Sequence, residues 1–111
     1  MDLEIQTIWS PDLSPPSSGY PSDRSDFAIL LQVSIGERGK AGGEVFSLDV
    51  VSPSQLCRYA SGTIISHTLV LDYFDWQVVE DRLSKLLRHA ASAKNWEQVV
   101  GSFTGLLAYA D

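Results

Sequence analysis

The residue types that most often form metal centres and nucleophilic sites are scarce in this chain. Its histidines are His67 and His89, and its one cysteine is Cys57. These positions are well separated, and none has a second Cys or His at the short spacing that zinc sites use. A single cysteine is more often a small buried side chain than a nucleophile. The sequence therefore predicts neither a metal centre nor a bound cofactor, and it favours a structural role for Cys57.

Two carboxylates, Asp72 and Asp75, are separated by a pair of aromatic residues. Paired carboxylates perform acid–base chemistry when their surroundings push their pKa values apart, and they also need a cleft. Asp75, however, directly precedes a stretch with helical periodicity, where an aspartate commonly serves as N-cap. An enzyme built on this chain would need a pocket that gathers Asp72 with His67 or Cys57. Since no motif indicates such a pocket, we expect a protein without enzymatic activity.

A glycine-rich stretch, residues 36–42, is the remaining candidate for chemistry, because such loops can cradle a phosphate. A phosphate loop joins a strand to a helix, so that the backbone amides at the helix start converge on the anion. Here apolar and polar residues alternate on both sides, over 27–35 and 43–51, with the period of a β-strand. Glycine also supplies the positive φ that tight hairpin turns need. We therefore interpret the stretch as the turn of a β-hairpin.

Length and composition predict a single domain, 1–111. The chain has 44% apolar and 20% charged residues, which is ordinary for a globular domain. Its 14 acidic and 8 basic residues give a formal net charge of −6, which disfavours nucleic acid and anionic membranes and favours a basic partner. The single cysteine excludes an intrachain disulfide, and residues 1–5 lack the basic and then apolar pattern of a secretory signal. No apolar stretch is long enough to span a membrane, so we expect a cytoplasmic location.

The segments before and after the hairpin have recognisable local signals. Alternation over 3–9 predicts another strand. Residues 10–25 hold four of the chain's five prolines and predict a long, mobile, Pro/Ser-rich loop, which is more consistent with a tolerated insertion than with a functional loop. Ser52 followed by Pro53 is typical of a helix start, with Gln55 placed to reach back to the cap.

Later in the chain, β-branched residues over 63–73 predict a fourth strand, and the periodicity then becomes helical. One helix is expected after Asp75, and a second from Asn95 to the C-terminus or nearly so. The predicted fold is α+β: a four-stranded, largely antiparallel sheet with two C-terminal helices packed on one face. The core beneath these helices is expected to contain Phe27, Ile29, Leu31, Phe46, Leu48, Val79, Leu83, Leu87, Val100, Phe103 and Leu107.

Three segments in a fixed order resemble a known family. They are the hairpin strands, 27–36 and 43–53, followed by 74–76, with Trp96 opening the last helix. In this order they resemble the immunity protein 8 family of bacterial polymorphic toxin systems, over roughly residues 26–107. The resemblance implies an antitoxin, a small cytosolic protein that binds a cognate toxin domain made by the same cell. Such a protein blocks its toxin by occlusion and needs no catalysis.

An acidic antitoxin would suit a basic toxin, because complementary charge speeds encounter and sharpens the choice of partner. Acidic residues are therefore the first candidates for contacts with the toxin. Asp75, Trp76 and Trp96 are instead expected to be a helix cap and core anchors. The candidate toxin contacts are Asp23, Asp26, Glu37, Glu44, Asp49 and Asp72.

The sheet leaves a different function open. The hairpin has one apolar face and one mixed face, and the mixed face would also suit a small-molecule-binding or homodimeric assembly module. The mass of such a homodimer in solution would depend on protein concentration. The residues of this mixed face are Leu30, Gln32, Val45, Ser47, Asp49 and Val51.

Overall fold

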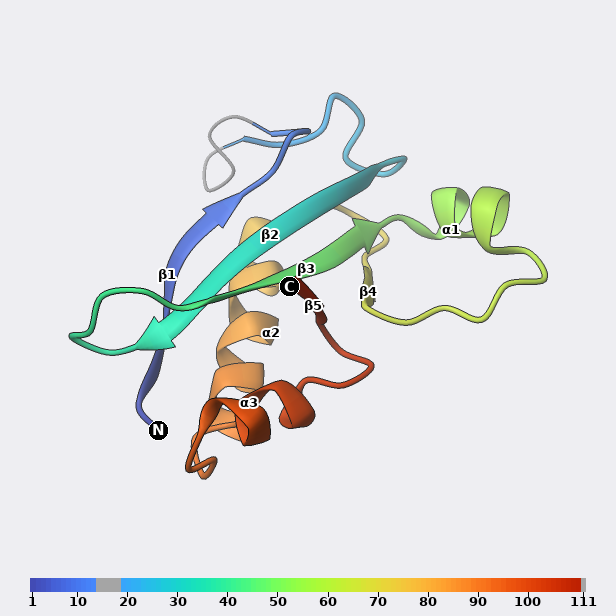
Figure 1. Cartoon of the computed structure of the whole chain (residues 1–111). Helices are drawn as coiled ribbons and strands as arrows, with labels where there is room; N and C mark the ends of the chain where they lie inside the picture. Colours follow the sequence, from blue (N-terminus) through green and yellow to red (C-terminus); the bar gives the residue numbers. More distant parts are fainter. Residues whose placement is uncertain (14–18, 111) are drawn as a thin grey trace.

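The computed structural model describes residues 1–13 and 19–110 (Figure 1). Residues 14–18, in the middle of the predicted Pro/Ser-rich loop, lie outside this description. The elements follow the chain in the order β1 (Leu3–Trp9), β2 (Ala28–Glu37), β3 (Glu44–Val51), α1 (Pro53–Ala60), β4 (Thr68–Val70), α2 (Trp76–His89), α3 (Trp96–Ser102) and β5 (Ala108–Ala110).

The strands form one mixed sheet in the order β1-β2-β3-β4, with β5 also paired to β3. β1 and β3 run antiparallel to β2, and β5 runs antiparallel to β3, whereas β4 runs parallel to it. β4 and β5 share the outer edge of β3: β4 lies along Asp49–Val51 and β5 along Val45–Ser47. The predicted α+β fold with a largely antiparallel sheet is confirmed, and β5 is an additional short strand.

This shared edge explains why the fourth strand is shorter than predicted. β4 covers only Thr68–Val70 of the expected 63–73, and Ile64 is 99% exposed. In the observed register, extending β4 backward would pair residues 64–66 with Val45–Ser47. β5 already occupies those positions, so the earlier residues have no strand to pair with.

The prediction that the last helix runs to the C-terminus or nearly so is wrong. α3 ends at Ser102, and the chain turns at Gly105, which has a φ of 80°. The turn is favoured because the ring of Phe103 is fully buried against Phe46, edge to face, with 5.2 Å between the ring centroids. Beyond it, β5 gains backbone hydrogen bonds to an otherwise free edge of β3. Non-local pairing therefore overrides the helical spacing of the apolar residues in this segment.

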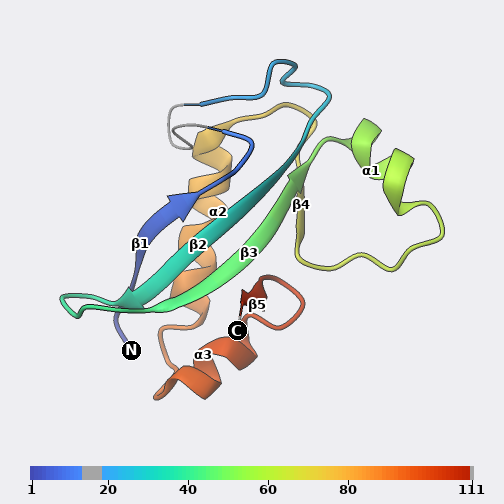
Figure 2. The ribbon, with the colours of Figure 1, turned by 45° about the horizontal axis from the view of Figure 1, so that its top comes forward.

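α2 and α3 both lie against one face of the sheet, as Figures 1 and 2 show. The predicted core is confirmed, except that Leu87 and Val100 are only partly buried at its margin. The side chains with no exposed surface at the centre of this covered face include Leu31, Val33, Phe46, Val50, Val79, Val99 and Phe103.

Side-chain caps fix where the helices begin, as the sequence predicts for Asp75, Asn95 and Ser52. The carboxylate of Asp75 accepts from the N–H of Gln77 at 3.0 Å, and the amide oxygen of Asn95 accepts from the N–H of Gln98 at 2.9 Å. The hydroxyl of Ser52 accepts from the N–H of Gln55 at 3.5 Å. Gln55 itself does not reach back to this cap, because its side-chain amide donates to a carboxylate before β2.

The described parts of the Pro/Ser-rich segment are tied to the rest of the domain. Leu13 is buried in the core cluster. The Asp12 carboxylate accepts from the N–H of Leu30 at 2.9 Å, and the carbonyl of Arg24 accepts from the N–H of Phe74 at 2.7 Å. Residues on both sides of 14–18 therefore help to position β2 and the start of α2.

Candidate functional site

One face of the sheet faces away from α2 and α3 (Figures 1 and 2). The strand registers align its residues across the sheet, with Trp9 beside Gln32, Gln32 beside Ser47, and Leu30 beside Asp49. We call this surface the open face. Its residues are Thr7, Trp9, Leu30, Gln32, Ser34, Val45, Ser47, Asp49, Thr68 and Val70.

The open face mixes exposed apolar and polar side chains. Trp9 is 55% exposed, Val70 43% and Val45 37%, and short polar side chains lie among them. Val51, predicted for this face as well, lies on the same side of β3, since it pairs with Ala28 and Val70, but its side chain is buried where β3 leads into α1. The mixed face predicted from the hairpin alternation otherwise lies on this surface.

Charge is distributed unevenly between the open face and the helices. The described strands contain no lysine or arginine, but they contain the carboxylates of Glu4, Glu37, Glu44 and Asp49. In contrast, α2 carries three exposed cations, Arg82, Lys85 and Arg88, together with two exposed acids, Glu80 and Asp81. The negative charge of the chain is therefore greater on the sheet side than on the outer surface of α2.

Asp26, a candidate toxin contact, serves to tether α1. Its carboxylate accepts from the hydroxyl of Ser54 at 2.7 Å and from the side-chain amide of Gln55 at 3.0 Å. The guanidinium of Arg58 lies 3.7 Å from its second oxygen. The hydrogen bonds from Ser54 and Gln55 hold the pKa of Asp26 below its ordinary value.

Asp23, a second candidate, closes a local turn. Its carboxylate accepts from the backbone N–H of Ser25 at 2.9 Å and from the hydroxyl of the same residue at 2.8 Å. These two hydrogen bonds lower the pKa of Asp23, since they favour its charged form. The candidates Asp23 and Asp26 thus have partners within the chain.

Glu37 and Glu44 lie at the turn end of the hairpin and are also engaged. A carboxylate oxygen of Glu37 is 2.6 Å from the ammonium of Lys40, and this contact raises the pKa of Lys40. The carboxylate of Glu44 accepts from the hydroxyl of Tyr109 at 2.7 Å. Glu37, Glu44 and Trp96 all border a hollow of about 220 Å³. The structure therefore places this pair away from the centre of the open face.

Asp49 and Asp72 are exposed, and neither carboxylate has a hydrogen bond or ion pair within residues 1–13 and 19–110. Asp72 lies in the connection between β4 and α2. Asp49 lies on the open face, beside Leu30 and Thr68. The six candidates are thus not gathered in one place, and Asp49 is the one whose side of the strand belongs to the open face.

A shallow hollow of about 250 Å³ adjoins Asp49 at the end of the open face where β2 begins. Asp12 also borders it, and Ala28, Leu30 and Val51 are among its apolar lining residues. Asp12 was not among the residues predicted from the sequence. Its role depends on the strand register: β1 pairs with β2 only as far as Gln32, so the N–H of Leu30 is left to donate to the Asp12 carboxylate.

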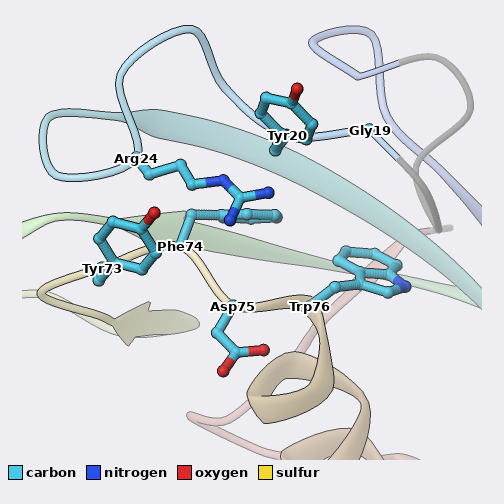
Figure 3. Close-up of a pocket in the computed structure, with 7 residues that line it drawn as sticks. All are labelled: Gly19, Tyr20, Arg24, Tyr73, Phe74, Asp75 and Trp76. Atoms are coloured by element: carbon cyan, nitrogen blue, oxygen red, sulfur yellow. The ribbon is translucent and has the colours of Figure 1, made fainter.

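A second hollow, of about 400 Å³, is shown in Figure 3. Arg24 reaches between two tyrosines, with its guanidinium carbon 4.2 Å from the ring centroid of Tyr20 and 5.6 Å from that of Tyr73. Both tyrosines are more than half exposed. We call this group the arginine–tyrosine pocket. No sequence signal could have joined Tyr73 to the distant loop that carries Tyr20 and Arg24.

Trp76 lines the same pocket and stacks on Phe74, with 6.1 Å between the ring centroids. Its indole N–H is buried, and it has no hydrogen-bond partner within the described residues. Trp76 and Trp96 are both partly buried against the core, which agrees with the expected anchoring role.

The groups that an enzyme would need are not brought together. Cys57 is exposed on α1, and the His67 ring lies 3.2 Å from the hydroxyl of Ser66. Neither His67 nor Cys57 lines any of the five main hollows among the described residues. Among the described residues, no group of three or more His, Cys, Asp or Glu side chains could hold a metal ion. No helix within 1–13 or 19–110 has the length and apolar character needed to cross a membrane.

Comparison with known proteins identifies a protein family. The model of a protein family described as Immunity protein 8 matches residues 3–109, nearly the whole chain. No curated protein and no solved structure matches the chain. The family match extends beyond the range of the resemblance found in the sequence, since it includes β1 and reaches into β5.

Proposed function

Because the chain belongs to the immunity protein 8 family, we propose that it protects a bacterial cell by binding a cognate toxin domain made by that cell. Binding would occlude the working surface of the toxin, so the immunity protein itself needs no catalytic group. The proposed place of action is the cytoplasm. The family match over residues 3–109 is the observation that carries this proposal.

The shape and surface of the molecule suit neutralisation by occlusion. Stable protein complexes bury about 800 Å² of surface on each partner. A molecule with extents of 39 × 32 × 22 Å offers that much on one face. The open face also has the mixed composition of a non-obligate interface, with apolar side chains such as Trp9 and Val70 among polar ones.

The net charge supports a basic toxin as the partner. With a formal net charge of −6, the chain attracts a positively charged protein at long range. Such steering raises the association rate and weakens as salt screens it, over a Debye length of about 8 Å at physiological ionic strength. Fast association is useful to an immunity protein, since it must capture the toxin before the toxin finds its target.

The direct test is a growth-rescue experiment with the toxin domain encoded next to this gene. Expression of that domain alone should stop growth, and co-expression of this chain should restore it. The two proteins should then co-purify. An unrelated toxin domain serves as the control and should be neither bound nor neutralised. If the chain folds but gives neither rescue nor co-purification, the proposal is wrong for that toxin.

The exposure of Trp9 and Val70 on one face of the sheet also favours a second candidate function, a homodimeric or small-molecule-binding module. In a homodimer, the two open faces would cover one another. Light scattering across a wide range of protein concentrations separates the homodimeric module from a monomeric immunity protein. A mass that stays near 12.2 kDa excludes the homodimer.

A further inference from the structure

We infer that the immunity protein contacts its toxin through the open face, and that Asp49 receives a positively charged side chain of the toxin there. This inference rests on the proposed function and goes beyond it by naming the surface, the residue and the chemistry of the partner. It follows from three observations: the composition of the face, the distribution of charge, and the state of the other acidic residues.

The first observation is that the domain leaves this sheet face free. α2 and α3 bury the opposite face, whereas Trp9, Val45 and Val70 remain between 37% and 55% exposed. On this face each of them has a polar residue two positions away along its strand, namely Thr7, Ser47 and Thr68, so a partner would meet apolar and hydrogen-bonding groups together. Such a mixture is typical of interfaces between proteins that are also stable alone.

The second observation is the charge of this face. The described strands carry no lysine or arginine, and the Asp49 carboxylate has no ion-pair partner among the described residues. The hollow beside it is bordered by Asp12 and floored by Ala28, Leu30 and Val51. A lysine or arginine of the toxin would lay its methylene groups on this apolar floor and place its charge between the two carboxylates.

The third observation is that the competing surfaces suit a basic partner less well. Asp26 and Glu37 are already paired with Arg58 and Lys40. The outer surface of α2 carries three exposed cations, Arg82, Lys85 and Arg88, against two exposed acids, Glu80 and Asp81, so it has no net negative charge to attract a basic partner. The arginine–tyrosine pocket likewise presents a cation, Arg24, to any partner that approaches it.

The experiment compares two charge reversals that change the net charge equally but lie on opposite sides of the molecule. Asp49→Lys acts on the open face, and Glu80→Lys acts on an exposed position of α2. Each is titrated against the toxin domain encoded beside this gene, carrying an inactivating substitution. Melting curves establish first that both variants fold.

We expect Asp49→Lys to weaken binding by on the order of tenfold or more, and the neutral variant Asp49→Asn to weaken it less. Part of the loss should be a slower association that depends less on salt. Glu80→Lys should bind within about twofold of the original chain, since a charge outside the interface acts only through the screened long-range field. Equal losses for Asp49→Lys and Glu80→Lys would overturn the inference.

Zero-length carbodiimide cross-linking gives an independent reading, because it joins a carboxylate to a lysine that touches it. The complex with the toxin domain should yield cross-linked peptides containing Asp49 or Asp12. Cross-links confined to carboxylates of α2 would assign the interface to the opposite side. If the original chain does not bind at all, the proposed function fails together with this inference. If it binds and only the face is wrong, the proposed function stands alone.

Discussion

Neighbouring residues of the same strand have opposite environments in this protein. In β3, Phe46 has no exposed surface, whereas Val45 is 37% exposed and Asp49 carries an exposed carboxylate. The side chains of the covered face are buried against α2 and α3. The open face contributes little to the core, and its side chains are therefore available to a partner. The comparison teaches that folding and binding use alternate residues of one hairpin.

This separation has an energetic consequence. Burying a large apolar side chain contributes about 1.5–3 kcal/mol relative to leaving it exposed, whereas surface substitutions usually change stability by less than about 0.5 kcal/mol. Substitutions on the covered face should therefore reduce the free energy of unfolding. Substitutions on the open face should leave that free energy nearly unchanged and affect binding instead.

The largest expected effect on stability is at the centre of the covered face. Phe46→Ala should lower the free energy of unfolding by about 3–5 kcal/mol, because it leaves a cavity and removes the ring that Phe103 packs against. Urea denaturation followed by tryptophan fluorescence measures the loss. A loss below about 1 kcal/mol would mean that this face is not the core of the domain.

A smaller loss is expected at the turn end of the hairpin, where the two strands close. A β-carbon added at Gly43 would lie 2.5 Å from the carbonyl oxygen of Ile35 and 2.8 Å from the side-chain oxygen of Gln6. Because the backbone must shift, Gly43→Ala should cost about 1–3 kcal/mol of unfolding free energy. Gly101→Ala in α3 is the matched control, since no atom beyond its local neighbours comes within 4 Å of the added carbon. That control should stabilise the domain slightly, and an equal loss in both variants would contradict the argument.

The tether between Asp26 and α1 predicts a small stability difference that depends on pH. The pKa of Asp26 is lower in the folded protein than the value of 3.8 that is ordinary for an aspartate. The stability that the ionised Asp26 carboxylate contributes to the folded protein is therefore fully present above about pH 4, and it is lost as the pH falls through the pKa of the folded state. Asp26→Asn should be less stable than the original chain at pH 7, and the two should converge in strong acid.

Melting temperatures measured from about pH 2 to about pH 7 test this difference, since that range lies on both sides of the ordinary aspartate pKa. Asp72→Asn is the control, because no hydrogen bond reaches the Asp72 carboxylate within the described residues. If the melting temperatures of the Asp26 variant and the original chain differ by the same amount at every pH, the carboxylate charge is not involved.

The smallest effect on stability is expected beside Phe46, on the other face of the same strand. Val45→Thr keeps the β-branched shape that suits a strand and replaces one exposed methyl group by a hydroxyl. The free energy of unfolding should change by less than about 0.5 kcal/mol. A change comparable to that of Phe46→Ala would show that the open face belongs to the core, and it would remove the contrast between the two faces.

Much of this arrangement could be predicted from the sequence, where the signal is local. The alternation of the hairpin strands, the N-caps at Asp75 and Asn95, and the apolar stripe of α2 each depend on neighbouring residues only. These local signals were enough to predict the fold class, and most of the residues that they assigned to the core are buried.

What could not be predicted depends on competition between distant segments. β4 is short because β5 pairs with the rest of the same edge of β3. The hydrogen-bond partners of the acidic candidates could not be predicted for the same reason, since those of Asp26 and Glu44 lie 28 and 65 positions away in the sequence. Sequence patterns showed which residues are acidic, but not which carboxylates the fold would leave without a partner.

The most direct test of the central claim, that the face left free by the fold is the face that binds, is a nuclear magnetic resonance titration. At 12.2 kDa, the chain gives well-resolved amide spectra, into which the inactivated toxin domain is titrated. The account predicts that the largest shifts cluster on the open face, at Ser47, Asp49 and Thr68, while the outer residues of α2 from Glu80 to Arg88 stay unchanged. Shifts confined to α2, with the sheet unaffected, would contradict it.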